Sequence, residues 1–480
     1  MSAKKSYHPI IVPALDALIG DPDLVQPQAD SKKKADEFYI PNQYIDRLHS
    51  FRDEQSSRGE AAIKLLNTFA HALETTHYSD EDVYTCANGT QIRFVGYDKV
   101  ELKSSNGRSG STTYALATAR YAQEQANAKD DVAIMTGDSY MSAKALGEDI
   151  DVAHINPDVY TGRRKLVLPE ALYDSWFKHR QITAEEFAEH FPQQKPLLLN
   201  EFVEFEFDSF VTVSYGIPYG GRYHHFIGRF EPSEDGGVLR QLHYIDDLPR
   251  YLDLRSPGQA MLAEALLAPV DEIPIVVCPA IFGTGKTYLA TAIGIEQVVS
   301  ADTDYDRIFI VPRDAELGKD IGFLPGDERD KTIARAMPIV DNVRNYLKSK
   351  GDRKRGNTPL SARDLDAKVD SMLEQNFEFV SIINMGGRSI SDSWIIYDES
   401  QDMERFQINQ LMKRIGDGSK MVITGDPRQV YNRHMNYHSN GLMYAATKMA
   451  GSQYAAVVTM HEGEITRSVA AREIARCLDH

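Results

Sequence analysis

The chain has 480 residues, too many for one hydrophobic core, which predicts two or three domains. Its formal net charge of −17 argues against a protein that coats nucleic acid indiscriminately, although a motor with one basic channel remains compatible with it. No apolar run approaches the roughly 20 residues that span a bilayer, the N-terminus MSAKKSYHP has no apolar signal region, and the three cysteines are scattered. We therefore expect a cytoplasmic protein with no membrane partner and no disulfides.

Residues 1–165 alternate between strand-like and helix-like segments, which predicts an α/β domain with a parallel sheet. Asp16 and Asp138 follow the apolar runs at residues 10–12 and 132–136. Carboxylates at the ends of parallel strands can hold divalent metals. Aspartates in such places also cap helices and form turns, so both roles stay open.

Residues 166–195 are expected to be a helical linker, and residues 196–247 show strand-like alternation with glycine-rich turns. The second segment predicts a small antiparallel β domain, most simply a barrel. Its run from Arg222 to Arg229 interleaves basic and aromatic side chains, which suits stacking on single-stranded bases. A strand with an aromatic inner face and a polar outer face produces the same pattern.

The stretch IVVCPAIFGTGKTYL, residues 275–289, predicts a strand, a phosphate-binding loop and a helix. Lys286 would reach the outer phosphates, and Thr287 would ligate Mg²⁺. Ala280 stands where the pattern GxxxxGK[ST] has its first glycine. The candidate nucleotide-binding residues of this loop are Gly283, Thr284, Gly285, Lys286 and Thr287.

Further apolar strands are expected at residues 307–311, 393–397 and 421–424, each followed by polar residues, and they predict a phosphate-loop ATPase core. After the strand at residues 393–397, Asp398 would hold the Mg²⁺ shell, and Glu399 would polarise the water that attacks the γ-phosphate. Gln429, just past the strand at residues 421–424, is placed to sense the γ-phosphate. These side chains predict a hydrolytic site.

Three other features are candidates for contacts with nucleotide or nucleic acid, although each could also be an ordinary surface feature. Gln259 precedes the nucleotide-binding strand, and a side-chain amide there can read the edge of adenine. Arg467 could act as an arginine finger, in cis or from a neighbouring subunit. The basic run at residues 344–355 is either a solvated loop or a nucleic-acid contact. Its candidate contact residues are Arg353, Lys354 and Arg355.

From about residue 197 to 470 the chain resembles the PhoH-like ATPases, a branch of the superfamily 1 helicase-like proteins. The resemblance is carried by LNEFV, SPGQ, FGTGKTYLA, IGFLPGD, MGGRSI, IIYDESQD, RIGDGSKMVITGD and TRS. It implies ATP and Mg²⁺ as cofactors and RNA or another single-stranded nucleic acid as partner, with Arg388 as a contact. It also implies a homo-oligomeric ring, such as a hexamer.

The first 165 residues are similar to a PIN domain, a metal-dependent ribonuclease fold found ahead of the ATPase in this family. Asp16 and Asp138 match the first and last acidic positions, whereas Arg47 and Thr113 stand at the other two. The resemblance therefore implies a PIN-like fold of doubtful nuclease activity. Mg²⁺ or Mn²⁺ would bind there only if the site is active.

The expected fold class is α/β, with a P-loop NTPase core of the superfamily 1 helicase type at residues 248–480. The PIN-like and small β domains precede it. We expect an ATP-dependent helicase or translocase acting on RNA or another single-stranded nucleic acid. Two alternatives stay open: a PIN ribonuclease fed by an ATPase motor, and a slow ATP-binding regulatory or interaction protein.

Overall fold

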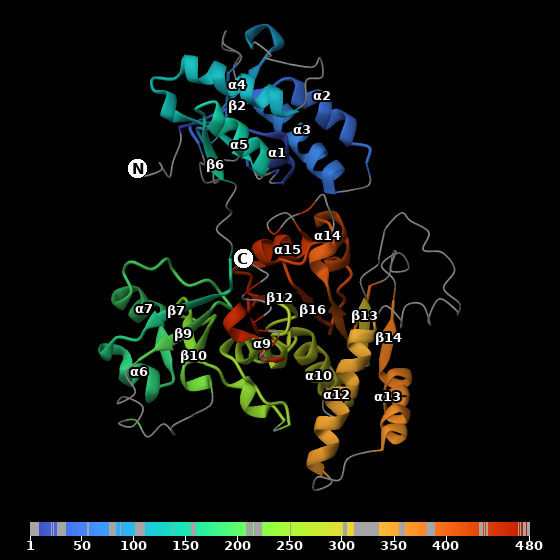
Figure 1. Cartoon of the computed structure of the whole chain (residues 1–480). Coiled ribbons are helices and arrows are strands. Elements are labelled where there is room, and N and C mark those ends of the chain that lie inside the picture. Colours follow the sequence, from blue (N-terminus) through green and yellow to red (C-terminus); the bar gives the residue numbers. More distant parts are fainter. Residues whose placement is uncertain are drawn as a thin grey trace, which may run out of the picture. The chain divides into compact units, whose positions relative to one another are not determined.

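The computed structural model divides the chain into two compact units, Met1–Pro157 and Asp158–His480 (Figure 1). The first boundary was expected at residue 165. The structure describes residues 9–477 except 21, 23, 26–34, 55–56, 76–82, 87, 101–110, 137, 155–159, 208–214, 216–222, 250, 301–304, 312–335, 355–360, 381–388, 432–434, 436, 438–439, 469, 471 and 474–476. None of the described helices is both long enough and apolar enough to cross a bilayer.

The first unit is built on a six-stranded sheet with the order β3-β4-β2-β1-β5-β6. All neighbouring strands are parallel except β3, which runs antiparallel to β4. The strands are β1 (Ile10–Pro13), β2 (Glu37–Pro41), β3 (Val83–Thr85), β4 (Gln91–Val95), β5 (Val132–Thr136) and β6 (Asp151–His154). The helices are α1 (Leu15–Gly20), α2 (Gln43–Phe51), α3 (Ser57–Thr75), α4 (Ser111–Gln125) and α5 (Ser139–Gly147). The parallel α/β sheet is confirmed.

The second unit begins with a five-stranded sheet in the order β7-β9-β10-β11-β8. Its strands are β7 (Arg163–Val167), β8 (Gln181–Thr183), β9 (Phe202–Glu206), β10 (Ile227–Glu231) and β11 (Val238–Gln241), with α6 (Tyr173–Phe177) and α7 (Ala184–His190). The expected helical linker is thus wrong in part, because its span completes β7 and supplies β8. No pairing of β7 with β8 closes a barrel among the described residues. Within the expected β domain, the strand-like run at residues 210–215 lies outside the described residues except for Tyr215.

A second, wholly parallel sheet follows, with the order β14-β13-β15-β16-β12-β17. Its strands are β12 (Ile275–Pro279), β13 (Arg307–Val311), β14 (Phe377–Phe379), β15 (Ser393–Tyr397), β16 (Lys420–Gly425) and β17 (Ala455–Val457). The helices are α9 (Pro257–Leu267), α10 (Lys286–Val299), α12 (Met337–Lys354), α13 (Ala362–Asn376), α14 (Arg405–Met412) and α15 (Gly441–Met449). Four of the six strands were expected from the sequence.

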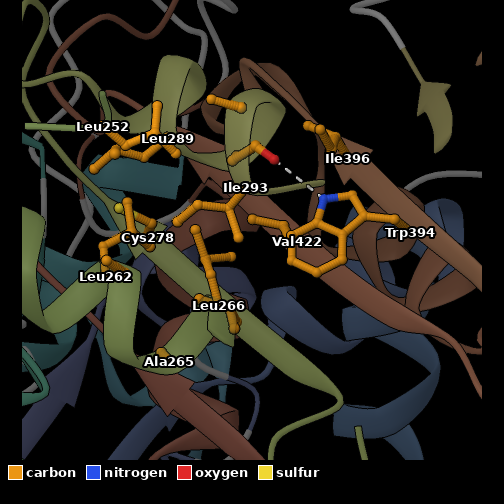
Figure 2. Packing of buried hydrophobic residues seen from close by; sticks show 14 of the residues in the cluster. Leu252, Leu262, Ala265, Leu266, Cys278, Leu289, Ile293, Trp394, Ile396 and Val422 are labelled. Carbon is orange, nitrogen blue, oxygen red and sulfur yellow. Dashed lines mark hydrogen bonds between the residues drawn. The ribbon is translucent and has the colours of Figure 1, made fainter. Parts of the chain in front are cut away.

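The parallel sheet is buried on both faces, which explains its continuous apolar strands. Along β15, Trp394 and Ile396 pack into one core while Ile395 and Tyr397 pack into the other, because successive strand residues point to opposite faces. Figure 2 shows the first core, in which α9 and α10 supply leucines and isoleucines that meet Trp394 and Val422. The indole nitrogen of Trp394 donates to the Ala290 carbonyl at 3.2 Å, so the ring is fixed against α10.

Candidate nucleotide-binding and hydrolysis site

The loop between β12 and α10 has the backbone that its glycines predict. Gly283 and Gly285 adopt φ angles of 77° and 87°, in the left-handed region that favours glycine. A Cβ at Gly285 would lie 2.9 Å from the side-chain nitrogen of Gln259, so space also requires glycine there. Helix α10 starts at Lys286, directly after the turn. The loop therefore leads the chain into a helix N-terminus, where backbone N–H groups can bind phosphate.

Ala280 occupies the first-glycine position of the loop pattern without strain. It has no positive φ angle and is 1% exposed. Its backbone nitrogen donates to the Gly425 carbonyl at 2.9 Å, and it forms a parallel bridge with Met460. Because the backbone is ordinary at this position, an alanine is compatible with the loop.

Thr287, Asp398 and Thr424 meet where the strands end. The Thr287 hydroxyl donates to Asp398 Oδ1 at 3.1 Å, and the Thr424 hydroxyl donates to the same atom at 2.6 Å. Burial raises the pKa of the Asp398 carboxyl, whereas the nearby Lys286 ammonium opposes that rise. Mg²⁺ typically binds through one or two carboxylates together with substrate phosphates. Thr287 and Asp398 would supply the oxygen ligands for such a site.

Lys286 offers a test of whether the site fits a nucleotide. Its side chain is 7% exposed, yet it forms no ion pair with any carboxylate of the described residues. A buried charge is costly unless a partner neutralises it. The phosphates of a nucleotide lying in the loop would be that partner, so the residues fit a bound Mg²⁺–nucleotide.

Glu399 follows Asp398 and is held by a buried glutamine. Its backbone is left-handed, with φ 55° and ψ 34°, which is uncommon outside glycine. Gln401 Nε2 donates to Glu399 Oε2 at 2.7 Å and to the Gln429 carbonyl at 3.3 Å. The Gln401 oxygen accepts the Asp426 backbone N–H at 3.0 Å. One side chain therefore ties the candidate base to the segment that carries Gln429.

The sequence predicted Gln259 as an adenine reader, and the structure gives its amide other partners. Gln259 Nε2 donates to the Thr284 carbonyl at 2.7 Å and to the Thr466 hydroxyl at 3.1 Å. Its oxygen accepts the Arg255 backbone N–H at 2.8 Å. The adenine role remains a prediction, and it would require these bonds to break.

Arg467 lies beside the loop in the same chain. A Cβ built on Gly283 would be 3.4 Å from Arg467 Cβ and 3.1 Å from Ile465 Cγ2. The Thr466 backbone N–H donates to the Gly283 carbonyl at 3.0 Å. The Arg467 side chain itself is exposed. The candidate arginine is thus next to the phosphate loop without a second copy of the chain.

Comparison with known proteins agrees with this geometry: residues 251–479 match the PhoH family, described as PhoH-like protein. The chain contains a PhoH-like domain. Protein PhoH2 of Bacillus subtilis is 28% identical over 311 residues, which cover 64% of this chain and 62% of that protein. Protein PhoH2 of Mycolicibacterium smegmatis is 29% identical over 44% of each chain. A PhoH-like protein of Bacillus subtilis is 31% identical over 31% of this chain and 41% of its own length.

The chain therefore matches only about half of the length of these relatives, from 41% to 62%. The alignment with the Bacillus PhoH2 protein is longer than the matched family segment, so this similarity continues before residue 251. The P-loop α/β fold expected for the PhoH-like domain is confirmed, and the domain is of a nucleotide-binding type.

Outside the PhoH-like domain, Asp16 and Asp138 follow the paired strands β1 and β5. The Thr136 hydroxyl donates to both oxygens of Asp16, at 2.9 and 3.0 Å. The Asp138 side chain caps α5 by accepting from the backbone of Tyr140 and Met141. In the part of the chain that the structure describes, no three His, Cys, Asp or Glu side chains gather as a metal site. Of the expected metal site, the described residues therefore contain Asp16 and Asp138, and both carboxylates accept hydrogen bonds from within the first unit.

The structure describes only some of the residues that the sequence suggested as nucleic-acid contacts. Arg388 and Arg355 lie outside the described residues, as do the side chains of Arg353 and Lys354. Arg344 of the same basic run pairs with Asp366 at 2.9 Å. Arg229, from the run that suggested base stacking, is 2% exposed and pairs with Glu231 at 2.8 Å, so its position is an internal one.

Sequence reasoning missed several residues that shape the site. Gln401, Thr424 and Asp426 lie inside quoted motifs, and their nearness to Asp398 and Glu399 was the available signal. Thr466 precedes the candidate Arg467, and no pattern connects it with Gln259. The ion pair of Arg163 with the buried Glu464, at 2.9 Å, gave no signal because its members are far apart in the sequence.

Proposed function

We propose that the protein hydrolyses ATP with Mg²⁺ and uses this to move along or unwind RNA or another single-stranded nucleic acid. Lys286 binds the outer phosphates in this proposal, and Thr287 and Asp398 hold Mg²⁺. Glu399 orients the attacking water, and Gln429 senses the γ-phosphate. Mg²⁺ supplies the Lewis-acid stabilisation of charge on the phosphates when it is bound.

One observation carries the hydrolytic part of the proposal. The Thr287–Asp398 pair, joined at 3.1 Å, is followed directly by Glu399, whose carboxylate is fixed by Gln401 at 2.7 Å. A site that only binds nucleotide needs the loop and the metal ligands, but it does not need an oriented carboxylate beside them. A carboxylate base that is held in place beside the metal ligands favours an ATP-hydrolysing enzyme over a protein that mainly binds ATP.

The nucleic-acid part rests on the PhoH-like similarity and on one exposed aromatic residue. Tyr431 lies two residues after Gln429 and is 66% exposed, while its backbone N–H is held by Asp402 at 2.8 Å. Exposed aromatic rings stack on bases of any sequence. A cytoplasmic homo-oligomeric ring belongs to the same proposal and rests on the family resemblance alone.

The first unit serves in this proposal as a PIN-like domain that does not cut RNA. Asp16 accepts a hydrogen bond from the Thr136 hydroxyl, and the Asp138 side chain caps helix α5. The alternative of an active ribonuclease needs at least one further carboxylate beside these two. The described residues supply no such cluster.

The test is steady-state ATP hydrolysis with and without single-stranded RNA, in the wild type and in Glu399→Gln. Loss of general-base assistance lowers such rates by about 10²–10⁴-fold. The variant should still bind Mg²⁺–ATP, because Lys286, Thr287 and Asp398 remain. Lys286→Ala is the matched variant that should lose binding itself.

A wild-type rate that RNA stimulates and that Glu399→Gln abolishes supports the motor. A slow wild-type rate that ignores RNA and survives Glu399→Gln would overturn it in favour of a nucleotide-binding interaction protein.

A further inference from the structure

The chain segment after β17 runs along the phosphate loop and is hydrogen-bonded to it at both ends. Near the start of the loop, the Ile281 backbone N–H donates to the Met460 carbonyl at 3.3 Å. Near its end, the Thr466 backbone N–H donates to the Gly283 carbonyl at 3.0 Å. We call residues 460–467 the C-terminal strap. Its path is fixed relative to the loop by these two bonds.

Gln259 fastens the C-terminal strap to the loop from the side of α9. Its amide nitrogen bonds both the Thr284 carbonyl of the loop, at 2.7 Å, and the Thr466 hydroxyl of the strap, at 3.1 Å. The side chain is 4% exposed, so these bonds form away from competing water. One buried amide thus sets the distance between the loop and the residue that precedes Arg467.

A buried carboxylate fixes the strap three residues before Arg467. Glu464 accepts from the Arg163 guanidinium at 2.9 and 3.0 Å, and from the backbone N–H groups of Gly258 at 2.6 Å and His461 at 2.9 Å. Breaking one partner of a buried pair is strongly destabilising. The strap therefore cannot swing away from the loop without exposing this network.

The guanidinium of Arg467 has no such anchor. Other arginines that reach the strap are paired, Arg428 with Glu462 and Arg163 with Glu464. Arg467 forms no ion pair with a described carboxylate, although its Cβ and Cδ would lie 3.4 and 4.0 Å from a Cβ on Gly283. A fixed backbone with an exposed, unpaired guanidinium beside a phosphate loop suits the recognition of phosphate oxygens.

We propose that Arg467 serves the phosphates bound by its own chain and that Gln259 positions it through Thr466. This rests on the proposed ATP hydrolysis and decides between the two sources of the arginine that the sequence left open. No neighbouring subunit has to supply a guanidinium, even if the chain forms a ring. The charge that develops on the γ-phosphate in the transition state is stabilised from within one copy.

Complementation between two inactive chains tests the proposal. Arg467→Ala and Glu399→Gln carry different tags, are co-expressed, and are isolated by two successive affinity steps so that only mixed oligomers remain. Each variant alone should lose about 100-fold or more of the wild-type turnover. If the arginine acts in cis, every site in the mixed oligomer contains one defect and the activity stays at the level of the single variants.

Recovery of a sizeable part of wild-type turnover in the mixed oligomer would overturn the proposal, because a site with intact Glu399 would then borrow Arg467 from its neighbour. If the two steps recover no mixed oligomer while the wild type turns over ATP under the same conditions, the chain works as single copies and the proposal stands. A wild type with no ATP turnover refutes the proposed function instead. Arg472→Ala, an exposed arginine five residues further on, is the control for the loss of one guanidinium.

The positioning role of Gln259 has its own readout. Gln259→Ala should lower kcat in the wild type, and the fold-loss should shrink when Arg467 is already alanine, because part of the effect acts through that residue. Equal fold-losses in both backgrounds would mean that Gln259 merely supports the loop. Gln259→Asn, which keeps the amide on a shorter side chain, should recover some of the loss.

Discussion

The side-chain amide of Gln401 donates to the carboxylate of Glu399 at 2.7 Å, although only one residue separates them in the sequence. The left-handed backbone of Glu399 turns its side chain back toward Gln401. Non-glycine residues in this conformation carry about 1–2 kcal/mol of strain, which the surrounding hydrogen bonds must hold. Gln401 also binds the Gln429 carbonyl and the Asp426 N–H, so it links the segment after β15 to the segment after β16.

We predict that Gln401→Ala lowers kcat for ATP by at least about tenfold, equal to about 1.4 kcal/mol of transition-state stabilisation. The affinity for ATP should change far less, because the hydrogen bonds of Gln401 go to Glu399, Gln429 and Asp426 and not to Lys286 or Thr287. Initial-rate kinetics of Gln401→Ala gives kcat. ATP titration of Glu399→Gln with and without Gln401→Ala gives the affinity for ATP. A rise in KM at unchanged kcat would assign Gln401 to nucleotide binding instead.

Ala280→Gly restores the first glycine of the loop pattern, and we predict no gain in ATP affinity from it. Ala280 has an ordinary backbone, is buried, and pairs with Gly425 and Met460. Glycine would add flexibility to the unfolded chain and destabilise the fold by about 0.5–1 kcal/mol. Thermal unfolding and ATP titration measure both effects. A clear gain in affinity would show that the alanine restricts the loop.

Lys420 predicts a pH dependence of stability. Its ammonium is fully buried at the C-terminal end of α9, where it donates to the carbonyls of Ala265 at 3.2 Å, Leu266 at 3.0 Å and Ala268. Burial lowers the pKa of Lys420 from 10.5 to about 7. Between these values the unfolded chain binds a proton that the folded chain lacks, so stability rises with pH across this window.

Lys420→Met removes that titration. The free energy of unfolding of the wild type should therefore rise relative to that of the variant as the pH increases from 7 to 9. The expected relative gain is about 2 kcal/mol. Urea unfolding of both proteins at the two pH values measures it. A difference that does not change with pH would mean that the three carbonyls keep the ammonium charged throughout.

We predict from Asp16 and Asp138 that the first unit does not cleave RNA. The protein with single-stranded RNA and Mg²⁺ or Mn²⁺ should cleave no faster than Asp16→Asn, because no third His, Cys, Asp or Glu side chain of the described residues gathers with Asp16 and Asp138 as a metal site. Thr136→Val should destabilise this unit by about 1 kcal/mol through the lost hydrogen bonds. Metal-dependent cleavage by the wild type that disappears in Asp16→Asn would contradict the prediction and revive the ribonuclease.

The parts of the fold that the sequence predicted well are those set by local chemistry. Strand β5 and strand β15 occupy the predicted residues, because a buried apolar run needs no distant partner to be identified. The phosphate loop likewise follows from glycines at fixed spacing. Strand β8 was missed because three residues, Gln181–Thr183, are too few to show a period of two.

Long-range side-chain bonds set the limits of prediction at the site. Gln259 was assigned to adenine because its amide suits that edge, but only the fold reveals that Thr284 and Thr466 bind it. Arg163 and Glu464 are separated by 301 positions, and no spacing rule connects such residues. Both cases involve buried polar groups whose partners are decided by packing.

The bond between Arg163 and Glu464 also limits how the protein can be divided. The matched family segment starts at residue 251, yet Arg163 belongs to β7 of the preceding sheet. A polypeptide cut at residue 248 would retain the whole phosphate loop but leave the Glu464 carboxylate, 8% exposed, without its cation. The matched family segment is therefore not a module that can be transplanted alone, and a fragment that keeps this ion pair has to begin at or before β7.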